Sequence, residues 1–172
     1  MPDVELDVRS IIPDSTAATT RQALGRLGIA SILDVHRVQR WRMSFEGGDA
    51  YELAARLERV DVLVNANKHR ATTRILDGMP GEHRPPRSSR PRSAARSVWV
   101  AVESRGDSRA STTLSVLRDR LGFERLTGCT LTEMWRLDVA SDSLSDAQGI
   151  GRRAMEALLV NPQFQKGYLL DD

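Results

Sequence analysis

Three arginines that follow one another closely are the residues of this sequence best suited to bind an anion. Arg37, Arg40 and Arg42 occupy one short segment, with Trp41 beside the last two. A guanidinium group matches the forked geometry of phosphates and carboxylates. The segment could therefore contact a phosphate or an acidic partner, or it could form a solvated face, and the solvated face is the favoured interpretation.

A second tryptophan-arginine pair, Trp135-Arg136, repeats Trp41-Arg42 later in the chain. A large ring with one polar N–H is useful at protein contacts and equally useful in a core. The two indoles could lie at a contact between halves of the chain or with a partner, but packing in a core or on a sheet face is favoured. The candidate interface residues are Arg37, Arg40, Trp41, Arg42, Trp135 and Arg136.

The histidines and the single cysteine do not form a recognisable catalytic or metal-binding motif. His36, His69 and His83 have no cysteine or carboxylate at the spacing of metal ligands. Cys129 corresponds to Val35 in the repeat described below, which favours a small apolar strand residue over a nucleophile. We therefore expect no catalytic residue, no cofactor and no metal.

The sequence Gly149-Ile150-Gly151 is the one glycine pair that could suggest a phosphate-binding loop. It lies inside a helical pattern and lacks the lysine, serine or third glycine that phosphate loops need. Glycine at this place instead predicts that the helix packs closely against its neighbour.

The elements that position these residues follow from an internal repeat. Two motifs recur at the same interval. Trp41-Arg42 recurs as Trp135-Arg136, and Arg26-Leu27-Gly28 recurs as Arg120-Leu121-Gly122. Further matches upstream and downstream recur at nearly the same interval. Repetition at a fixed interval indicates a duplicated structural unit.

Each copy has the pattern of a strand, a helix, a long strand, a second helix and a short strand. Alternating apolar residues predict the strands, and apolar residues at helical spacing predict the helices. Gly28 and Gly122 should end the first helix of each copy. The predicted elements of the first copy are strand 4–8, a helix capped by Asp14 or Ser15, strand 32–45, helix 50–65 and strand 72–76. Those of the second copy are strand 98–102, a helix capped by Ser108, strand 126–139, a helix capped by Ser143 and strand 167–170. In the helix capped by Ser143, Ile150, Ala154, Ala157 and Leu158 should face inward.

A basic, proline-rich segment separates the two copies. Proline lacks an N–H donor and neighbouring arginines repel one another, so residues 77–96 should be an extended linker. The predicted domains are a first repeat at 1–76, the linker at 77–96 and a second repeat at 97–172. The predicted fold class is α+β: two tandem ferredoxin-like βαβαβ units, with antiparallel sheets and helices on one face, that form a pseudo-dimer.

Composition narrows the partners and the location. The net charge is only +2, so nucleic acid could be bound only through local clustering of arginines in the linker. The chain has one cysteine, no long apolar run and no signal-peptide pattern at its start, and we expect a cytoplasmic protein without a membrane span.

The segment Ala23-Leu24-Gly25-Arg26-Leu27-Gly28 with Asp34-Val35 and the strand that follows resembles the PurS family, the small subunit of phosphoribosylformylglycinamidine synthase. Leu158-Leu159-Val160-Asn161 resembles the run that ends the second helix of that family. The resemblance implies a small antiparallel sheet with two helices on one face, self-associated as a dimer.

The resemblance also implies a function. A PurS-like subunit would be a non-catalytic scaffold in purine biosynthesis, bridging a PurL-like synthetase and a PurQ-like glutaminase so that ammonia passes between them. A covalent tandem would be a built-in pseudo-dimer, with further homo-oligomerisation open. The alternative is a diverged tandem binding module whose arginine-rich linker binds nucleic acid or another polyanion.

Overall fold

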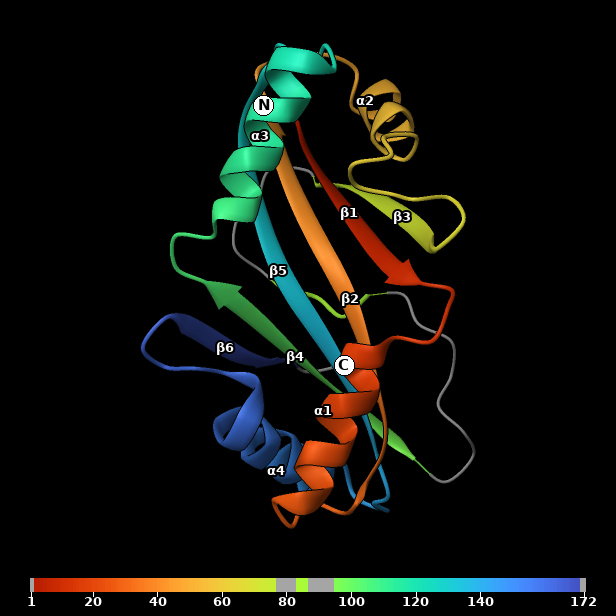
Figure 1. Ribbon diagram of the computed structural model, residues 1–172, viewed down its shortest axis with the longest axis vertical. Coiled ribbons are helices and arrows are strands. Elements are labelled where there is room, and N and C mark those ends of the chain that lie inside the picture. The colour runs from red at the N-terminus through yellow and green to blue at the C-terminus, as the bar shows by residue number, and fades with distance from the viewer. Residues whose placement is uncertain (1, 77–82, 87–94, 171–172) are drawn as a thin grey trace. The chain divides into compact units, whose positions relative to one another are not determined.

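The computed structural model describes residues 2–76, 83–86 and 95–170, which form an α+β fold with six strands and four α-helices (Figure 1). The strands belong to one sheet in the order β3-β1-β2-β5-β4-β6. The first part of the chain forms β1 (Asp3–Ser10), α1 (Ser15–Arg26), β2 (Ile32–Phe45), α2 (Ala50–Leu57) and β3 (His69–Leu76). The second part forms β4 (Arg96–Ser104), α3 (Ser108–Arg120), β5 (Leu126–Val139), α4 (Leu144–Ala154), the π-helical turn η1 (Met155–Leu159) and β6 (Gln165–Leu170).

Both long strands have the bounds that the sequence predicts, and each is 14 residues long. Gly28 and Gly122 follow α1 and α3 with φ angles of 80° and 72°, so their predicted role at helix ends is confirmed. Asp14 caps α1, and Ser143 caps α4 as predicted. The cap of α3 is Asp107 rather than Ser108, because the Asp107 carboxylate accepts a hydrogen bond from the backbone N–H of Arg109.

Two predictions about helix ends are wrong. The helix expected over 50–65 ends at Leu57, and the chain continues in turns in which the N–H of Val60 bonds the carbonyl of Leu57. Ala157 and Leu158 are exposed rather than inward-facing, because the helix widens into η1 and buries Leu159 instead.

The chain divides into two compact units, each built from both parts of the sequence. The first unit consists of Met1–Ile12, Gln39–Glu82 and Gly106–Thr132, and the second of Pro13–Val38, His83–Arg105 and Glu133–Asp172. The first unit therefore contains α3 from the later part of the chain, and the second contains α1 from the earlier part. The predicted boundaries at 76 and 97 concern the sequence repeat and stay a prediction.

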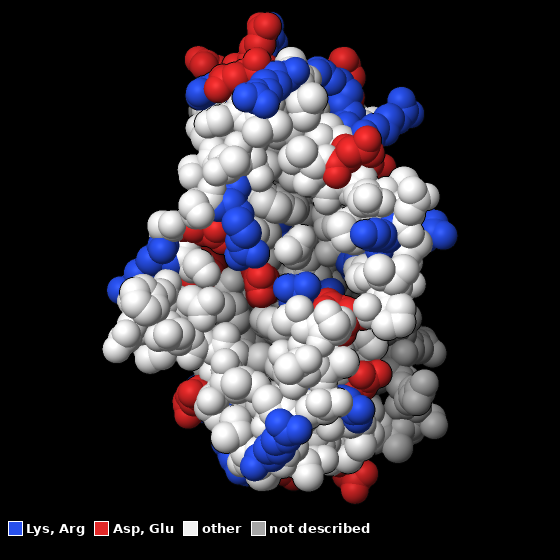
Figure 2. Space-filling model, viewed as in Figure 1, with Lys and Arg blue, Asp and Glu red and all other residues white. Residues whose placement is uncertain are grey.

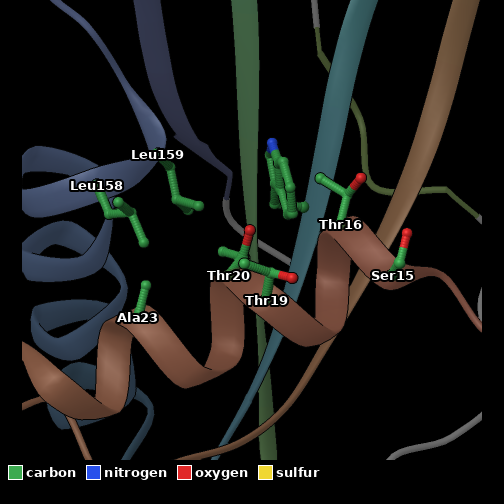
Figure 3. Close-up of a pocket in the computed structure, with 8 residues that line it drawn as sticks. Ser15, Thr16, Thr19, Thr20, Ala23, Leu158 and Leu159 are labelled. Atoms are coloured by element: carbon green, nitrogen blue, oxygen red, sulfur yellow. The ribbon is translucent and has the colours of Figure 1, made fainter.

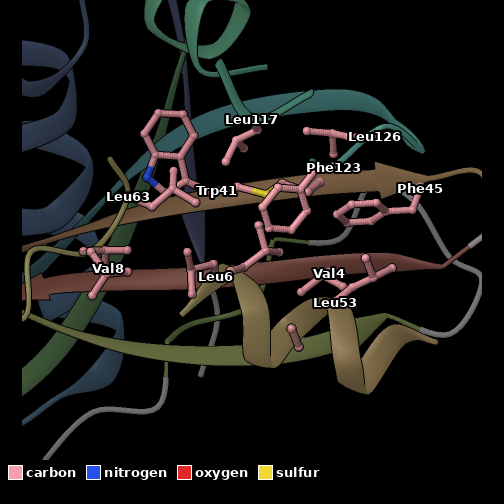
Figure 4. Packing of buried hydrophobic residues seen from close by; sticks show 14 of the residues in the cluster. Val4, Leu6, Val8, Trp41, Phe45, Leu53, Leu63, Leu117, Phe123 and Leu126 are labelled. Atoms are coloured by element: carbon pink, nitrogen blue, oxygen red, sulfur yellow. The ribbon is translucent and has the colours of Figure 1, made fainter. Parts of the chain in front are cut away.

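The first unit has a continuous apolar core on one face of its strands (Figure 4). β1 pairs antiparallel with β3, and Val4, Leu6 and Val8 alternate toward the core. α2 and α3 cover the same face, with α2 contributing Leu53 and α3 contributing Leu117. This two-helix layer over antiparallel strands is the arrangement expected for an α+β unit.

The second unit has the same kind of core beneath α1 and α4. β4 pairs antiparallel with β6, and its Val98, Val100 and Val102 face the core. Gly151 brings α4 close to β4, because a Cβ at this position would lie 2.6 Å from Val98 Cγ1. The opposite face of β4 carries Trp99 in a separate small apolar cluster.

Charged side chains of both signs are interspersed on the face of the molecule shown in Figure 2, without one extended region of a single sign. Within the described ranges, no helix is long and apolar enough to cross a membrane.

Candidate functional site

Arg40 lies buried in a network of ion pairs in the first unit. Its side chain is 2% exposed, and its guanidinium donates to both carboxylate oxygens of Asp7 at 2.7 and 2.9 Å. Glu5 Oε1 lies 3.3 Å from Arg40 Nε. The forked contact with Asp7 is the geometry in which arginine and carboxylate bind most strongly.

Arg42 and Arg74 complete the network around Glu5. Arg42 lies 3.2 Å from one Glu5 oxygen and Arg74 lies 3.6 Å from the other. The expected solvated arginine face is therefore wrong for Arg40. Since Val4, Leu6 and Val8 face the helices, the acidic residues between them face the other side of the strand, where Arg40 meets them.

Trp41 and Trp135 are each 6% exposed, and each belongs to an apolar core, which confirms the favoured interpretation of core packing. Trp41 packs in the first unit with Leu63 and Leu117 nearby (Figure 4). Trp135 packs in the second unit beneath α1.

Arg37 ties β2 to the start of α1 in the second unit. Its Nε lies 3.1 Å from Asp14, the residue that caps α1, and its Nη1 lies 3.8 Å from Glu133. The guanidinium carbon is 6.0 Å from the centre of the Trp135 ring, at the outer limit of a cation–π contact. Arg37 is therefore held by the capping residue of α1 and by two side chains of β5 rather than extended into solvent.

Arg136 belongs to a polar cluster around Asp138 in the second unit. Arg136 Nε and the Ser97 hydroxyl contact Asp138 Oδ1 at 3.1 and 2.8 Å. His36 Nε2 lies 3.5 Å from Asp138 Oδ2 and 3.4 Å from Asp34. Burial alone would raise the pKa of Asp138, but hydrogen bonds from His36 and Ser97 and the charges of Arg136 and His36 hold it below its ordinary value.

Asp138 and Ser97 were not predicted from the sequence as members of this cluster. A signal was available, because Arg136 and Asp138 are two residues apart on a strand and so share one face. Ser97 lies on another strand, and no local pattern connects it to Asp138.

A pocket opens beside α1 in the second unit and has a volume of about 410 Å³ (Figure 3). Successive turns of α1 present hydroxyl groups to it, while the indole of Trp135 and the two leucines of η1 supply apolar surface. Hydroxyls can donate and accept hydrogen bonds, and the ring and leucines favour an apolar group. The lining residues are Ser15, Thr16, Thr19, Thr20, Ala23, Trp135, Leu158 and Leu159.

The residues that line this pocket are suited to binding an amphipathic group. A serine or threonine becomes a nucleophile when a neighbouring base takes its proton, and the lining residues include no histidine and no carboxylate. An amphipathic group, such as an apolar side chain next to a backbone amide, fits the mixture of hydroxyl and apolar surface.

The remaining nucleophile and histidine candidates occupy structural positions. Burial raises the pKa of Cys129 to about 12, so its thiol is protonated at neutral pH. His83 contacts Glu103 at 3.1 Å and lies 5.0 Å from the Tyr168 ring, which places this residue of the predicted linker against β4 and β6. Across the described part of the chain, no group of three or more metal-binding side chains could hold a metal ion.

The alternative function, binding of nucleic acid, depends on the arginines of the predicted linker. Arg87, Arg90 and Arg92 lie outside the described residues, and β4 already begins at Arg96.

Comparison with known proteins identifies no family. No protein-family model and no curated protein matches the chain. Among solved structures, the chain is similar to an unknown protein from Galdieria sulphuraria, with 12% sequence identity, 98% of each chain covered and a TM-score of 0.19. A likeness with that TM-score carries no argument about fold or function.

Proposed function

We propose that this chain is a PurS-like scaffold subunit, non-catalytic itself, that brings an ATP-using synthetase and a glutaminase together in purine biosynthesis. In this role the chain is a tandem of two diverged ferredoxin-like copies. The tandem would replace the dimer that the PurS-like resemblance implies.

The observation that carries the proposal is the recurrence of one element order. The chain runs strand, helix, strand, helix, strand twice, and both long strands are 14 residues long. The matching motifs of the sequence fall on matching elements: Trp41 and Trp135 are equally buried, and Gly28 and Gly122 both end a helix with positive φ. A shared ancestry of the two parts accounts for all of these agreements together.

The pocket beside α1 is the proposed contact with a partner protein. Hydroxyls of Thr19 and Thr20 border it, and Trp135 and Leu159 provide apolar surface. An aromatic floor with a polar rim is typical of places that receive an anchoring side chain.

The test is complementation of bacteria that lack their own small PurS subunit. Cells expressing this chain should grow without added purines, and the chain should co-purify with the synthetase and the glutaminase. Thr19→Arg should abolish both effects because the long side chain fills the pocket. Ala18→Arg, at an exposed position of the same helix that does not line the pocket, should leave both effects intact.

Failure of the wild-type chain to rescue growth, with circular dichroism showing that it is folded, would overturn the scaffold role. Rescue by Thr19→Arg as good as that of wild type would leave the scaffold role standing and remove the pocket from it.

A further inference from the structure

The strand β3 is an edge strand with a row of backbone groups available for pairing. It pairs with β1 on one side, and within the described residues the sheet order begins with β3. Alternate N–H and C=O groups of an edge strand point away from its neighbour and can pair with another chain. The register of the pair fixes which β3 side chains share each face.

A groove lies next to this edge, between β3 and α2. It has a volume of about 690 Å³ and is lined by three alanines and a tyrosine of α2, by the two acidic residues that flank α2, and by two side chains of β3. Tyr51, one of its walls, is 80% exposed. The lining residues are Asp49, Ala50, Tyr51, Ala54, Ala55, Glu58, Thr73 and Ile75.

The register of β1 and β3 shows which side chains of β3 lie on the same face as the groove. Thr73 and Ile75 stand opposite Leu6 and Val4, so they share the face that α2 covers. A strand added alongside β3 would therefore direct every second side chain into the groove. The three alanines of α2 leave space there for large apolar side chains.

The other face of β3 carries two arginines, Arg70 and Arg74. Arg9 stands directly opposite Arg70 in the register, and Arg74, four residues further along β3, stands opposite Glu5 and pairs with it. Like charges directly opposite each other destabilise a strand pair. Within the described residues, Arg9 contacts the hydroxyl of Thr72 at 3.5 Å, and no ion pair with a carboxylate joins Arg9 or Arg70. An acidic side chain placed over this pair would relieve the repulsion.

We propose that the edge of β3 binds an extended segment of another protein in which apolar and acidic residues alternate. The segment adds a strand to β3, places its apolar side chains in the groove beside α2, and places its carboxylates over Arg9 and Arg70. Backbone hydrogen bonds supply affinity in this mode of binding, and alternate side chains supply specificity.

A second copy of the chain fits this edge less well. β3 contains no acidic residue, so the β3 strand of another copy would offer no carboxylate to Arg9 and Arg70. Charge thus favours an acidic partner over self-association. The surface belongs to the first unit and shares no residue with the proposed scaffold contact, and it does not depend on the scaffold role.

The test measures fluorescence anisotropy of a short labelled peptide of alternating leucine and glutamate, titrated with the whole chain. We expect saturable binding that weakens as salt is added. Arg70→Glu should weaken it by roughly tenfold or more, because attraction becomes repulsion. Ala55→Trp should weaken it comparably by filling the groove from an exposed position. The control Arg152→Glu reverses an exposed charge on α4 and should bind like wild type.

Two further peptides separate strand addition from simple charge attraction. A peptide of the same composition with glutamates and leucines in separate blocks, and an alternating peptide N-methylated on every second amide, should both bind at least roughly tenfold more weakly. Circular dichroism verifies that each protein variant is folded.

Three results would overturn the proposal: no binding of the alternating peptide to wild type, equal binding of a lysine-leucine peptide, or unchanged binding by Arg70→Glu. Self-association of the wild-type chain in light scattering that is abolished by Ala55→Trp would identify a second copy as the occupant instead.

Discussion

Arg40 shows how a charged residue can belong to the interior of a sheet protein. Removing a guanidinium and two carboxylates from water costs several kcal/mol per ion, by order of magnitude, and close pairing with hydrogen bonds must offset that cost. The forked contact of Arg40 with Asp7 and its proximity to Glu5 provide this compensation. The three groups therefore depend on one another.

Arg40→Met should destabilise the chain by about 3–5 kcal/mol, because it leaves Asp7 buried without its forked partner and removes one of the three arginines around Glu5. Urea unfolding followed by circular dichroism measures the change. Arg42→Met provides the control, since its side chain is 19% exposed and touches only one of the two carboxylates, and its loss should be clearly smaller. A loss of under about 1 kcal/mol for Arg40→Met would contradict the importance of the buried network.

Asp138 should make stability depend on acidity. Its pKa lies below the ordinary 3.8 in the folded chain, so its contribution is complete above that value and is lost as the pH falls through the lower folded-state pKa. The difference in unfolding free energy between wild type and Asp138→Asn should therefore shrink below pH 3.8. Urea midpoints measured over a range of acidic pH values test this, and parallel curves for the two proteins would contradict it.

Cys129 should be unreactive in the folded chain. With its pKa raised to about 12 by burial, very little thiolate exists at pH 8. Iodoacetamide should modify the native chain at least about a hundredfold more slowly than the urea-unfolded chain, whose thiol titrates normally. Mass spectrometry follows the reaction at this single cysteine, and similar rates in the two states would contradict the prediction.

At the scale of elements, α4 shows how one glycine and one wide turn set the packing of a helix. Gly151 permits the close approach to β4, and the π-helical turn after Ala154 changes which leucine faces the core. Leu159 is 8% exposed while Leu158 is 40% exposed.

Gly151→Ala and Gly149→Ala should have opposite effects on stability. The new methyl group at 151 would lie 2.6 Å from Val98 Cγ1, and such overpacking costs about 1–3 kcal/mol. The methyl group at 149 meets nothing within 4 Å, and alanine favours a helix over glycine by up to about 1 kcal/mol. Thermal unfolding of both variants tests the pair, and equal effects would show that the close contact is not limiting.

The strands at 4–8 and 98–102 were predictable from the sequence because their valines and leucine alternate with no charge on the core side. The long strand at 32–45 has no clean alternation. The end of α2 was not predictable, since Val60 and Val64 keep a helical spacing although the chain turns after Leu57. The burial of Arg40 depends on acids more than thirty residues earlier, Asp7 among them, and no local pattern contains that pairing. The pocket residues on α1 read as an ordinary polar helix face until η1 and Trp135 are placed beside them.

At the scale of the whole molecule, each compact unit draws one helix from the other part of the sequence. Leu117 of α3 is fully buried in the core of the first unit, and Leu24 of α1 is fully buried in that of the second. Neither core can be completed by residues 1–76 or 97–172 alone.

Fragments 1–76 and 97–172, expressed separately, should lack a cooperative unfolding transition as monomers, and mixing them should restore one. Mixing should restore the transition because the two fragments together supply the apolar residues of both cores. Circular dichroism with light scattering tests this, and a cooperatively folded monomer of either fragment would contradict it.

The buried ion network of the first unit also restricts how β1 can align with β2 during folding. Arg40 contacts Glu5 and Asp7, which flank Leu6 on β1. If β1 slipped by one residue, a buried guanidinium would face an apolar side chain, and every residue of β1 would turn to the wrong face of the sheet. Apolar packing alone tolerates a slip of two residues, because valine and leucine recur at that period, but a slip that moves Arg9 to the place of Asp7 would set two guanidinium groups against each other. The network thus excludes one of the alignments of β1 that its apolar residues would accept.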